Sequence, residues 1–333
     1  MRAARAPFHS SLAHEFARFA KQMQTTGGTH TSLMATIGRL DAFLAKAYPN
    51  VTTLSYDVLS EWFASFDHLR TTSQSRYRTA TFQVCKFLRG SNALTAIRED
   101  FQPFQVSRDF QPYIFSNQDI VRLLQAARAC SARPSNPLRP ETIELVVILL
   151  YTAGLRVGEV VRLNIADYDS SQGTLVIRET KFAKSRLVPV SPSAKAATDK
   201  YLSRRRQLHL ECAPENSLLW YPGRIRLHLG TLEQTLCHLL RQCGFKPLHG
   251  RLGARNHDLR HAFAHHRVLQ WYREGADIQR LLPYLSTYMG HRGLESTQLY
   301  LKVIPEVLNE ASALFGTLVK PVLGDRRQHD EAI

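Results

Sequence analysis

At residues 256–266 the chain reads NHDLRHAFAHH, a run in which ionisable side chains crowd an otherwise helical pattern. Helical spacing puts His257 and Arg260 three residues apart, and therefore side by side on one helix. An imidazole beside a guanidinium pairs an acid or base with an anion clamp, which suits a phosphodiester. This stretch predicts a site for phosphate chemistry in the second half of the chain.

The same stretch supports a competing hypothesis, a metal site. His257 and His261 lie one helical turn apart, as in a zinc-binding H-E-x-x-H helix, and Asp258 stands at the position of the glutamate. Aspartate reaches less far than glutamate, however, no third-ligand motif is recognisable downstream, and the cationic Arg260 repels a dication. A metal hydrolase stays an alternative, and the favoured prediction is a site with no metal.

Charge points to a polyanionic partner. The 43 Lys and Arg exceed the 28 Asp and Glu, which gives a formal net charge of +15 and a pI of about 9.9. The excess is spread along the chain, because residues 1–100 carry 12 basic and 7 acidic side chains and residues 112–333 carry 30 and 20. A polyanion is therefore the expected partner, although a high pI can also serve solubility alone.

Cysteine usage and hydropathy bear on the compartment. The five cysteines are an odd number without CxxC spacing, which favours buried thiols in a reducing compartment over disulfides or a zinc knuckle. The longest apolar run, residues 146–151, is too short to span a bilayer. We therefore expect a cytoplasmic protein without a membrane partner.

The first part of the chain predicts a small helical domain, residues 1–102. Apolar residues recur with helical spacing in four blocks, at 11–24, 31–47, 53–66 and 72–88. The fourth block leaves basic residues off its apolar stripe, where they could face DNA phosphates or only solvent. These DNA-binding candidates are Arg76, Arg78 and Lys86.

An aperiodic, Pro- and Gln-containing linker, residues 103–113, leads to a second domain, residues 114–333. Ser116 and Asp119 form a capping-box-like start for a helix over 117–129, and Gly154 ends the next helix. Two-residue periodicity predicts antiparallel strands at 174–180 and 186–190. The expected fold is therefore mainly α with a small antiparallel β-sheet, an α+β arrangement.

Two further features gain meaning only in combination. Arg156 directly follows the Gly154 turn and could point into a cleft, but an ion pair with Glu159 would also explain it. Residues 288–300 predict a turn that holds His291, followed by a short helical stretch ending in Tyr300. A lone tyrosine there is most often a packed aromatic.

Taken together, four boxes resemble, in order, the signature of the tyrosine recombinases, the phage-integrase family. They are YTAGLR at 151–156, HDLR at 257–260, GH at 290–291, and Tyr300, which lies nine residues after His291 as the family pattern requires. The resemblance covers roughly residues 114–318, whereas the helical first half is similar to the family's core-site DNA-binding domain only in pattern. It implies a two-domain, nucleoid-associated bacterial site-specific recombinase.

The resemblance also implies roles for the site residues. Arg156 and Arg260 are expected to stabilise the charge on the phosphate, and Tyr300 to attack it as nucleophile. His257, with His291 beside it, is the candidate for proton transfer from the phenol. No cofactor is expected, because a 3′-phosphotyrosyl bond conserves the energy of the broken linkage and rejoining needs no ATP.

The predicted hairpin supplies one more candidate. Residues 181–189, KFAKSRLVP, resemble the family's K-x-x-K-x-R-x-x-P strand pair, which makes Lys181 the expected general acid for the leaving 5′ oxygen. Lys184 is its rival, and otherwise a DNA-binding candidate at the loop tip.

Family assemblies imply a tetramer on double-stranded DNA that carries a specific recombination site, with other recombinases of the same element as further partners. Residues 307–315 are the candidate for a C-terminal helix, docked either on its own domain or on a neighbour. The expected role is integration and excision or transposition of a mobile element. Alternatives are replicon or chromosome dimer resolution, a type IB topoisomerase, and a non-catalytic DNA-binding regulator.

Overall fold

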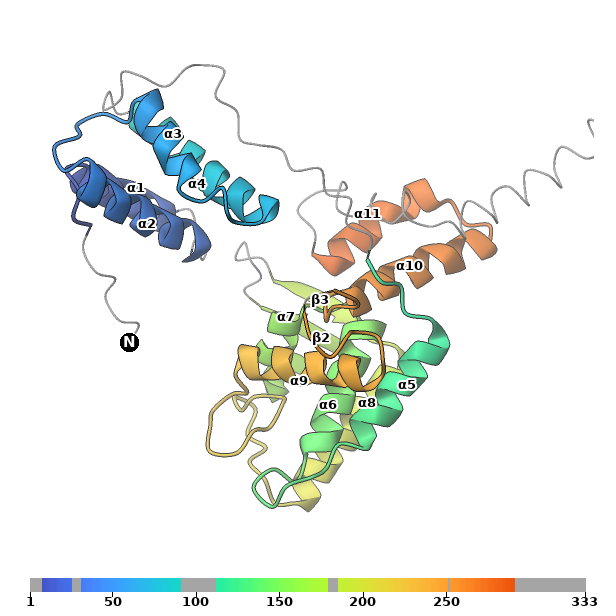
Figure 1. Ribbon diagram of the computed structural model, residues 1–333. Helices are drawn as coiled ribbons and strands as arrows, with labels where there is room; N and C mark the ends of the chain where they lie inside the picture. The colour runs from blue at the N-terminus through green and yellow to red at the C-terminus, as the bar shows by residue number, and fades with distance from the viewer. Residues whose placement is uncertain (1–7, 26–30, 91–111, 179–184, 251, 291–333) are drawn as a thin grey trace, which may run out of the picture. The chain divides into compact units, whose positions relative to one another are not determined.

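The computed structural model describes residues 8–25, 31–90, 112–178, 185–250 and 252–290 (Figure 1). These residues divide into two compact units, 8–90 and 112–290, and each unit is described by itself. Nearly all of the predicted linker, 103–113, lies outside the described residues. The residues around position 102, the predicted end of the first domain, lie outside them as well. The proposed domain boundaries therefore stay predictions.

The first unit consists of helices, as its periodicity predicts. The helix that differs most from its predicted block is the third, which begins at Tyr56 because the Ser55 side chain accepts a hydrogen bond from the backbone N–H of Val58 and caps it. The four helices are α1 (Ala13–Thr25), α2 (Thr31–Ala47), α3 (Tyr56–Ala64) and α4 (Thr71–Gly90).

The core of the first unit follows the predicted apolar stripe of α4. Tyr77, Val84 and Leu88 are buried against residues of the other helices. The buried Trp62 indole of α3 donates a hydrogen bond of 2.9 Å to the Thr81 hydroxyl of α4, so the polar tip of the largest side chain is satisfied. A helical unit of this kind is what the sequence predicts.

The second unit contains most of the helices and the sheet. Its first helix starts at the predicted capping box, in which the Asp119 N–H donates to the Ser116 hydroxyl and the Ser116 N–H donates to the Asp119 carboxylate. The helices are α5 (Asn117–Arg128), α6 (Arg139–Thr152), α7 (Val157–Arg162), α8 (Pro192–Gln207), α9 (Leu229–Gln242), α10 (Asp258–Arg273) and α11 (Ile278–Met289), with a 3₁₀ turn at Ile165–Asp167.

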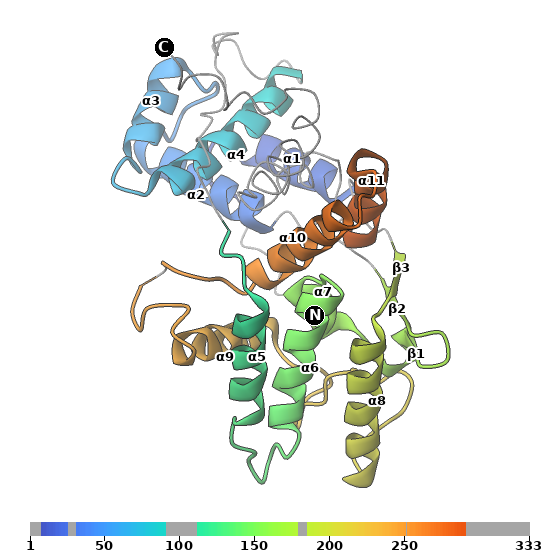
Figure 2. The same ribbon diagram turned by 90° about the vertical axis from the view of Figure 1, so that its right-hand side faces the viewer.

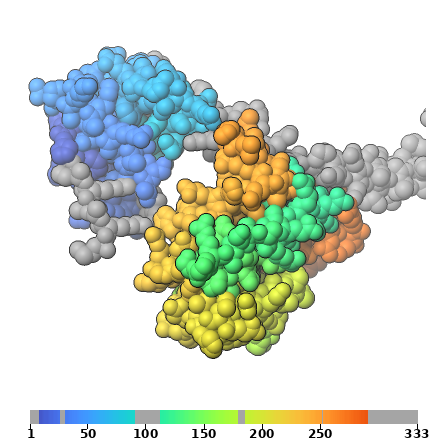
Figure 3. Space-filling view, turned by 60° about the horizontal axis from the view of Figure 1, so that its bottom comes forward, coloured from blue at the N-terminus to red at the C-terminus, as the bar shows by residue number. Residues whose placement is uncertain are grey.

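Helix α6 lies at the centre of this unit. Helices α5 and α8 lie on either side of it, and α10 packs against it as well (Figures 1 and 2). Leu145, Val146 and Leu149 are almost completely buried around α6, which matches its apolar sequence. The space-filling view shows the green surface of α5 and α6 directly beside the yellow surface of α8 (Figure 3).

The sheet is antiparallel with strand order β1-β2-β3. Strands β2 (Thr174–Ile177) and β3 (Arg186–Pro189) fall inside the two predicted strands, and their register places Arg186 opposite Ile177. Strand β1 (Tyr168–Asp169) was not predicted, because two residues are too few to show an alternating pattern. Among the described residues the fold is therefore mainly helical with a small antiparallel sheet, as predicted.

The turn after α6 is built for close packing. Gly154 has a φ of +57°, and a Cβ atom there would lie 2.4 Å from Cδ1 of Phe263 on α10. Only glycine combines this left-handed conformation with such a close neighbour. The predicted end of the helix at Gly154 is confirmed, and the turn brings Arg156 next to α10.

Over the part of the chain that the structure describes, no helix is both long enough and apolar enough to cross a membrane.

Candidate active site

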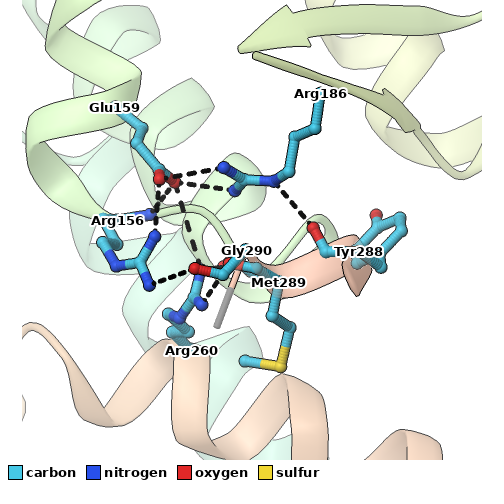
Figure 4. Close-up of polar contacts among 8 residues, drawn as sticks. Arg156, Glu159, Arg186, Arg260, Tyr288, Met289 and Gly290 are labelled. Carbon is cyan, nitrogen blue, oxygen red and sulfur yellow. Dashed lines mark hydrogen bonds and ion pairs between the residues drawn. The ribbon is translucent and has the colours of Figure 1, made fainter. Parts of the chain in front are cut away.

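Arg156 lies at the start of α7, where it faces a buried carboxylate (Figure 4). Its backbone N–H donates to Glu159 Oε2 at 2.9 Å and its Nη1 donates to Oε1 at 2.7 Å. Its Nη2 donates to the carbonyl oxygen of Gly290 at 3.0 Å. The ion pair that the sequence offered as a rival explanation does exist, but it holds Arg156 at the end of α11 with 34% of the side chain exposed.

Glu159 is the centre of this cluster, and its side chain is only 1% exposed. Burial by itself would raise the pKa of its carboxyl. The hydrogen bonds and charge of Arg186, followed by the backbone N–H and charge of Arg156, outweigh burial and lower the pKa to about 2. Glu159 is therefore an anion throughout the physiological pH range and can orient the arginines around it.

Arg260 joins the cluster from α10. It is buried, its Nη1 donates to the Gly154 carbonyl oxygen and its Nη2 to that of Met289. Its Nη1 also lies 4.0 Å from Glu159 Oε2. The structure thus brings together the two predicted arginines, 156 and 260, at one point between the Gly154 turn and the end of α11.

Arg186 is a member of the cluster that sequence reasoning did not single out as functional. Its Nη1 and Nη2 donate to the two carboxylate oxygens of Glu159 at 3.1 and 3.0 Å, and its Nε donates to the carbonyl oxygen of Tyr288 at 2.8 Å. The sequence feature that could have identified it is its position two residues before the buried Val188, since residues two apart in a strand face the same side.

His257 precedes α10 as its N-cap residue, and its carbonyl oxygen accepts from the backbone N–H of Arg260. Desolvation, then the charges of His261, Arg260 and Arg156, lower the pKa of His257 to about 4. The imidazole is therefore neutral at neutral pH, and the same lowered pKa makes it a weak proton acceptor.

The geometry does not favour the metal hypothesis. The rings of His257 and His261 pack edge to face with centroids 4.7 Å apart. The Asp258 carboxylate, which that hypothesis uses as the general base, is buried and accepts hydrogen bonds from the backbone N–H and the guanidinium of Arg255. Within the described ranges, no group of three or more His, Cys, Asp or Glu side chains could hold a metal ion.

Four predicted residues lie outside the described residues: Lys181, Lys184, His291 and Tyr300. Their attachment points are described. The hairpin loop begins after Arg178 and rejoins the sheet at β3, and the segment from 291 onward leaves Gly290, whose carbonyl oxygen is bonded to Arg156. Their roles stay predictions.

The DNA-binding candidates of α4 differ from one another. Arg76 and Lys86 are exposed. Arg78 is half-buried, lies 3.6 Å from Asp67 in an ion pair, and stacks over the Phe63 ring at 5.0 Å. Arg76 and Lys86 are therefore the better placed of the three for contact with a phosphate.

Guanidiniums present planar forks of donors that suit the oxygens of a phosphodiester, so a cluster of arginines is able to bind a phosphate. Residues 114–306, more than half of the chain, match the family model described as "Phage integrase family". The chain belongs to this family, the tyrosine recombinases, and is a DNA breaking-rejoining enzyme.

Individual comparisons agree with the family. A protein of Sinorhizobium fredii named as an integrase/recombinase, y4rB, is 42% identical over 210 residues, which cover 63% of this chain and 67% of that protein. The XerH recombinase bound to palindromic difH DNA in a post-cleavage complex has 18% identity and a TM-score of 0.62, over 86% of this chain and 79% of XerH. A lambda integrase tetramer bound to a Holliday junction has 13% identity and a TM-score of 0.58, over 85% of this chain and 77% of that chain. The two structures show that the fold is shared.

Proposed function

We propose that this recombinase cleaves DNA one strand at a time with Tyr300 as the nucleophile. The phenolic oxygen attacks the phosphorus, the bond from phosphorus to the 5′ oxygen breaks, and a 3′-phosphotyrosyl intermediate forms. A 5′-hydroxyl from another strand then reverses the step and joins the new strand. The observation that carries this proposal is the location of Arg156 and Arg260 beside Gly290, the last described residue before the segment with His291 and Tyr300.

The two arginines would bind the non-bridging oxygens of the scissile phosphate. A guanidinium presents its donors in a planar fork, so a pair of them can stabilise the charge that develops on phosphorus oxygens without a metal. Arg156 is partly exposed and accessible to a phosphate. Arg260 donates to the carbonyls of Gly154 and Met289, so a bound phosphate would add to these contacts or displace one of these carbonyls.

Proton transfers complete the reaction. An unperturbed phenol has a pKa of about 10 and must lose its proton as it attacks. His257 is the candidate base, because its imidazole is neutral at pH 7 and can take the proton as the phenol attacks, although its lowered pKa makes it a weak base by itself. The departing 5′ oxygen would take a proton from Lys181 of the hairpin, with Lys184 as its rival, and His291 would assist on the same side as Tyr300.

On DNA the protein would act as a tetramer, since exchange between two duplexes needs four cleavages and each protomer carries one nucleophile. The likeness in fold to the lambda integrase tetramer bound to a Holliday junction supports this arrangement. Arg76 and Lys86 would hold backbone phosphates of the recombination site. Similarity to an integrase/recombinase favours movement of a mobile element in the bacterial cytoplasm over dimer resolution.

The test is covalent trapping. Because the recognition sequence is unknown, the probe is the duplex that the unaltered chain selects from a random-sequence pool, with a nick next to each candidate cleavage position so that the cut strand is lost. The unaltered chain should form a protein–DNA adduct that survives denaturation, and Tyr300→Phe should form none. Arg156→Ala should bind the probe but not cleave it. An adduct that persists in Tyr300→Phe would overturn the assignment.

A further inference from the structure

Arg186 occupies the first position of β3, directly after the hairpin loop that carries the lysines. Its side chain is only 10% exposed. All three of its nitrogens donate to oxygen atoms of described residues: two to Glu159 and one to the carbonyl of Tyr288. A cation with this degree of burial and hydrogen bonding has a fixed orientation.

The partners of Arg186 come from separate parts of the unit. Glu159 belongs to α7 and also binds Arg156, whereas the carbonyl of Tyr288 lies in the last turn of α11 (Figure 4). A second bond joins β3 to α11, because the Tyr288 hydroxyl donates to the carbonyl oxygen of Pro189 at the other end of β3, at 3.0 Å. The strand is thus joined to α11 at both of its ends.

Gly290 shows how closely the guanidinium of Arg186 approaches the end of α11. Gly290 caps the helix with a φ of +66°, and a Cβ atom there would lie 2.8 Å from Arg186 Nη1 and 3.1 Å from its Cζ. A side chain at this position would strain the backbone and displace the guanidinium. A side chain at position 290 is therefore incompatible with the present position of the Arg186 guanidinium.

We propose that Arg186 is a positioning residue that sets the geometry of strand cleavage. It joins β3 to the end of α11 through the Tyr288 carbonyl and to α7 through Glu159. This inference rests on the proposed function, in which the segments that follow these positions carry the general acid and the nucleophile. The hairpin loop rejoins the fold at Arg186 itself, and the segment leading to Tyr300 starts one residue beyond Gly290. The Arg186 side chain thus fixes the described positions at which both segments attach to the fold. Through Glu159 it also contacts Arg156, the proposed phosphate-binding residue.

Geometry explains why the position needs arginine. A lysine has a single nitrogen and cannot span both oxygens of Glu159 while also reaching the carbonyl of Tyr288. Arg186→Lys should therefore keep the charge and lose most of the orientation, whereas Arg186→Met loses both. Arg178 offers a matched control on the same sheet, because it is exposed and pairs only with Asp167 in the described contacts.

The first experiment needs no DNA and no cleavage. Amide hydrogen exchange is measured on the full chain, without DNA, for peptides that cover residues 285–290. Loss of the Arg186 bonds in Arg186→Met should speed exchange of these amides about tenfold, the effect of removing one to two hydrogen bonds from a helix end. Arg178→Met should leave them unchanged.

The second experiment measures single-turnover adduct formation at saturating concentration of the selected nicked duplex. Misplacement of the reacting groups should slow Arg186→Met about tenfold to a hundredfold, with DNA affinity within about twofold of the unaltered chain. Arg186→Lys should be intermediate, and Arg178→Met should react at the normal rate. Gly290→Ala should be slow as well, and its effect should be smaller in the Arg186→Met background, because the contact with the guanidinium is already lost there and only the backbone strain remains.

Either of two results would overturn the inference. The first is a normal adduct rate in a folded Arg186→Lys, combined with either a normal adduct rate or normal amide exchange in Arg186→Met. The second is an equal loss of adduct rate in Arg186→Met and Arg178→Met. If Arg186→Met does not fold, Arg186→Lys and Gly290→Ala decide, and normal rates in both sink the inference. Failure of the proposed function looks different, since the unaltered chain would then form no adduct while the exchange experiment would still report on the contact.

Discussion

Replacing Glu159 by glutamine should destabilise the protein far more than an exposed ion pair would. The side chain is almost fully buried and accepts hydrogen bonds from Arg156 and Arg186, while Arg260 lies 4.0 Å away. Glutamine keeps the shape but loses the charge, and its NH₂ group opposes a guanidinium donor. The cations would then be left in the core without their counter-ion.

The magnitude follows from the pKa of Glu159, which is lowered from an ordinary 4.5 to about 2. At 1.36 kcal/mol per unit, the ionised form contributes about 3 kcal/mol to the free energy of unfolding. Because the folded pKa is the lower one, the contribution is fully present above pH 4.5 and is lost as pH falls toward 2. The destabilisation by Glu159→Gln should therefore shrink to about 2 kcal/mol at pH 3.5.

The assay is urea unfolding of the full chain and of Glu159→Gln at pH 7 and pH 3.5. Glu144→Gln is the matched control, because Glu144 pairs with the exposed Arg128 and such pairs contribute about 0–1 kcal/mol. A loss at pH 7 no larger than that of Glu144→Gln would refute the reasoning. So would a loss that grows as the pH is lowered.

Two further predictions concern the same unit. Gly154→Ala should lower the free energy of unfolding by about 2–4 kcal/mol, because the left-handed backbone and the contact with Phe263 both oppose a Cβ atom. The control is Gly158→Ala on α7, where the nearest neighbour of the new Cβ would be 3.4 Å away; this change should be neutral or stabilising. Equal shifts of the thermal unfolding midpoint in the two variants would contradict the packing argument. In an NMR titration of the free protein, with the resonance assigned through His257→Gln, the His257 imidazole should titrate near pH 4 and stay neutral above about pH 5.5, because burial and then the neighbouring charges lower its pKa. Arg156→Ala should raise the midpoint by removing one of these charges; a midpoint at 6.5 or higher in the unaltered protein would show that neither burial nor the cations act on the imidazole.

Much of the fold could be predicted because the signals are local. Helical periodicity located the helices of the first unit, and the capping box at Ser116 marked the start of α5. The end of α6 at Gly154 could be predicted because glycine readily adopts the left-handed conformation, which ends a helix. The ordered boxes likewise predicted Arg156, His257 and Arg260, which the structure brings together.

The part that could not be predicted depends on contacts between distant residues. Three residues after Arg156, Glu159 looks like half of a solvent-exposed ion pair, and only its burial beneath Arg186, 27 positions away, makes it the centre of the cluster. The bond from Arg186 to Tyr288 spans 102 positions. No local sequence pattern predicts a contact over such a separation. The roles of Glu159 and Arg186 therefore could not be predicted from the sequence.

The cluster around Glu159 also has a consequence for the timing of charge. Arg156, Arg186 and Arg260 against one carboxylate leave an excess of two positive charges, all set in place by protein contacts before any DNA arrives. A phosphodiester carries one negative charge, and its five-coordinate transition state carries two. In the proposed mechanism the cluster would match the charge of the transition state more closely than that of intact DNA, and this difference would lower the barrier to strand breakage.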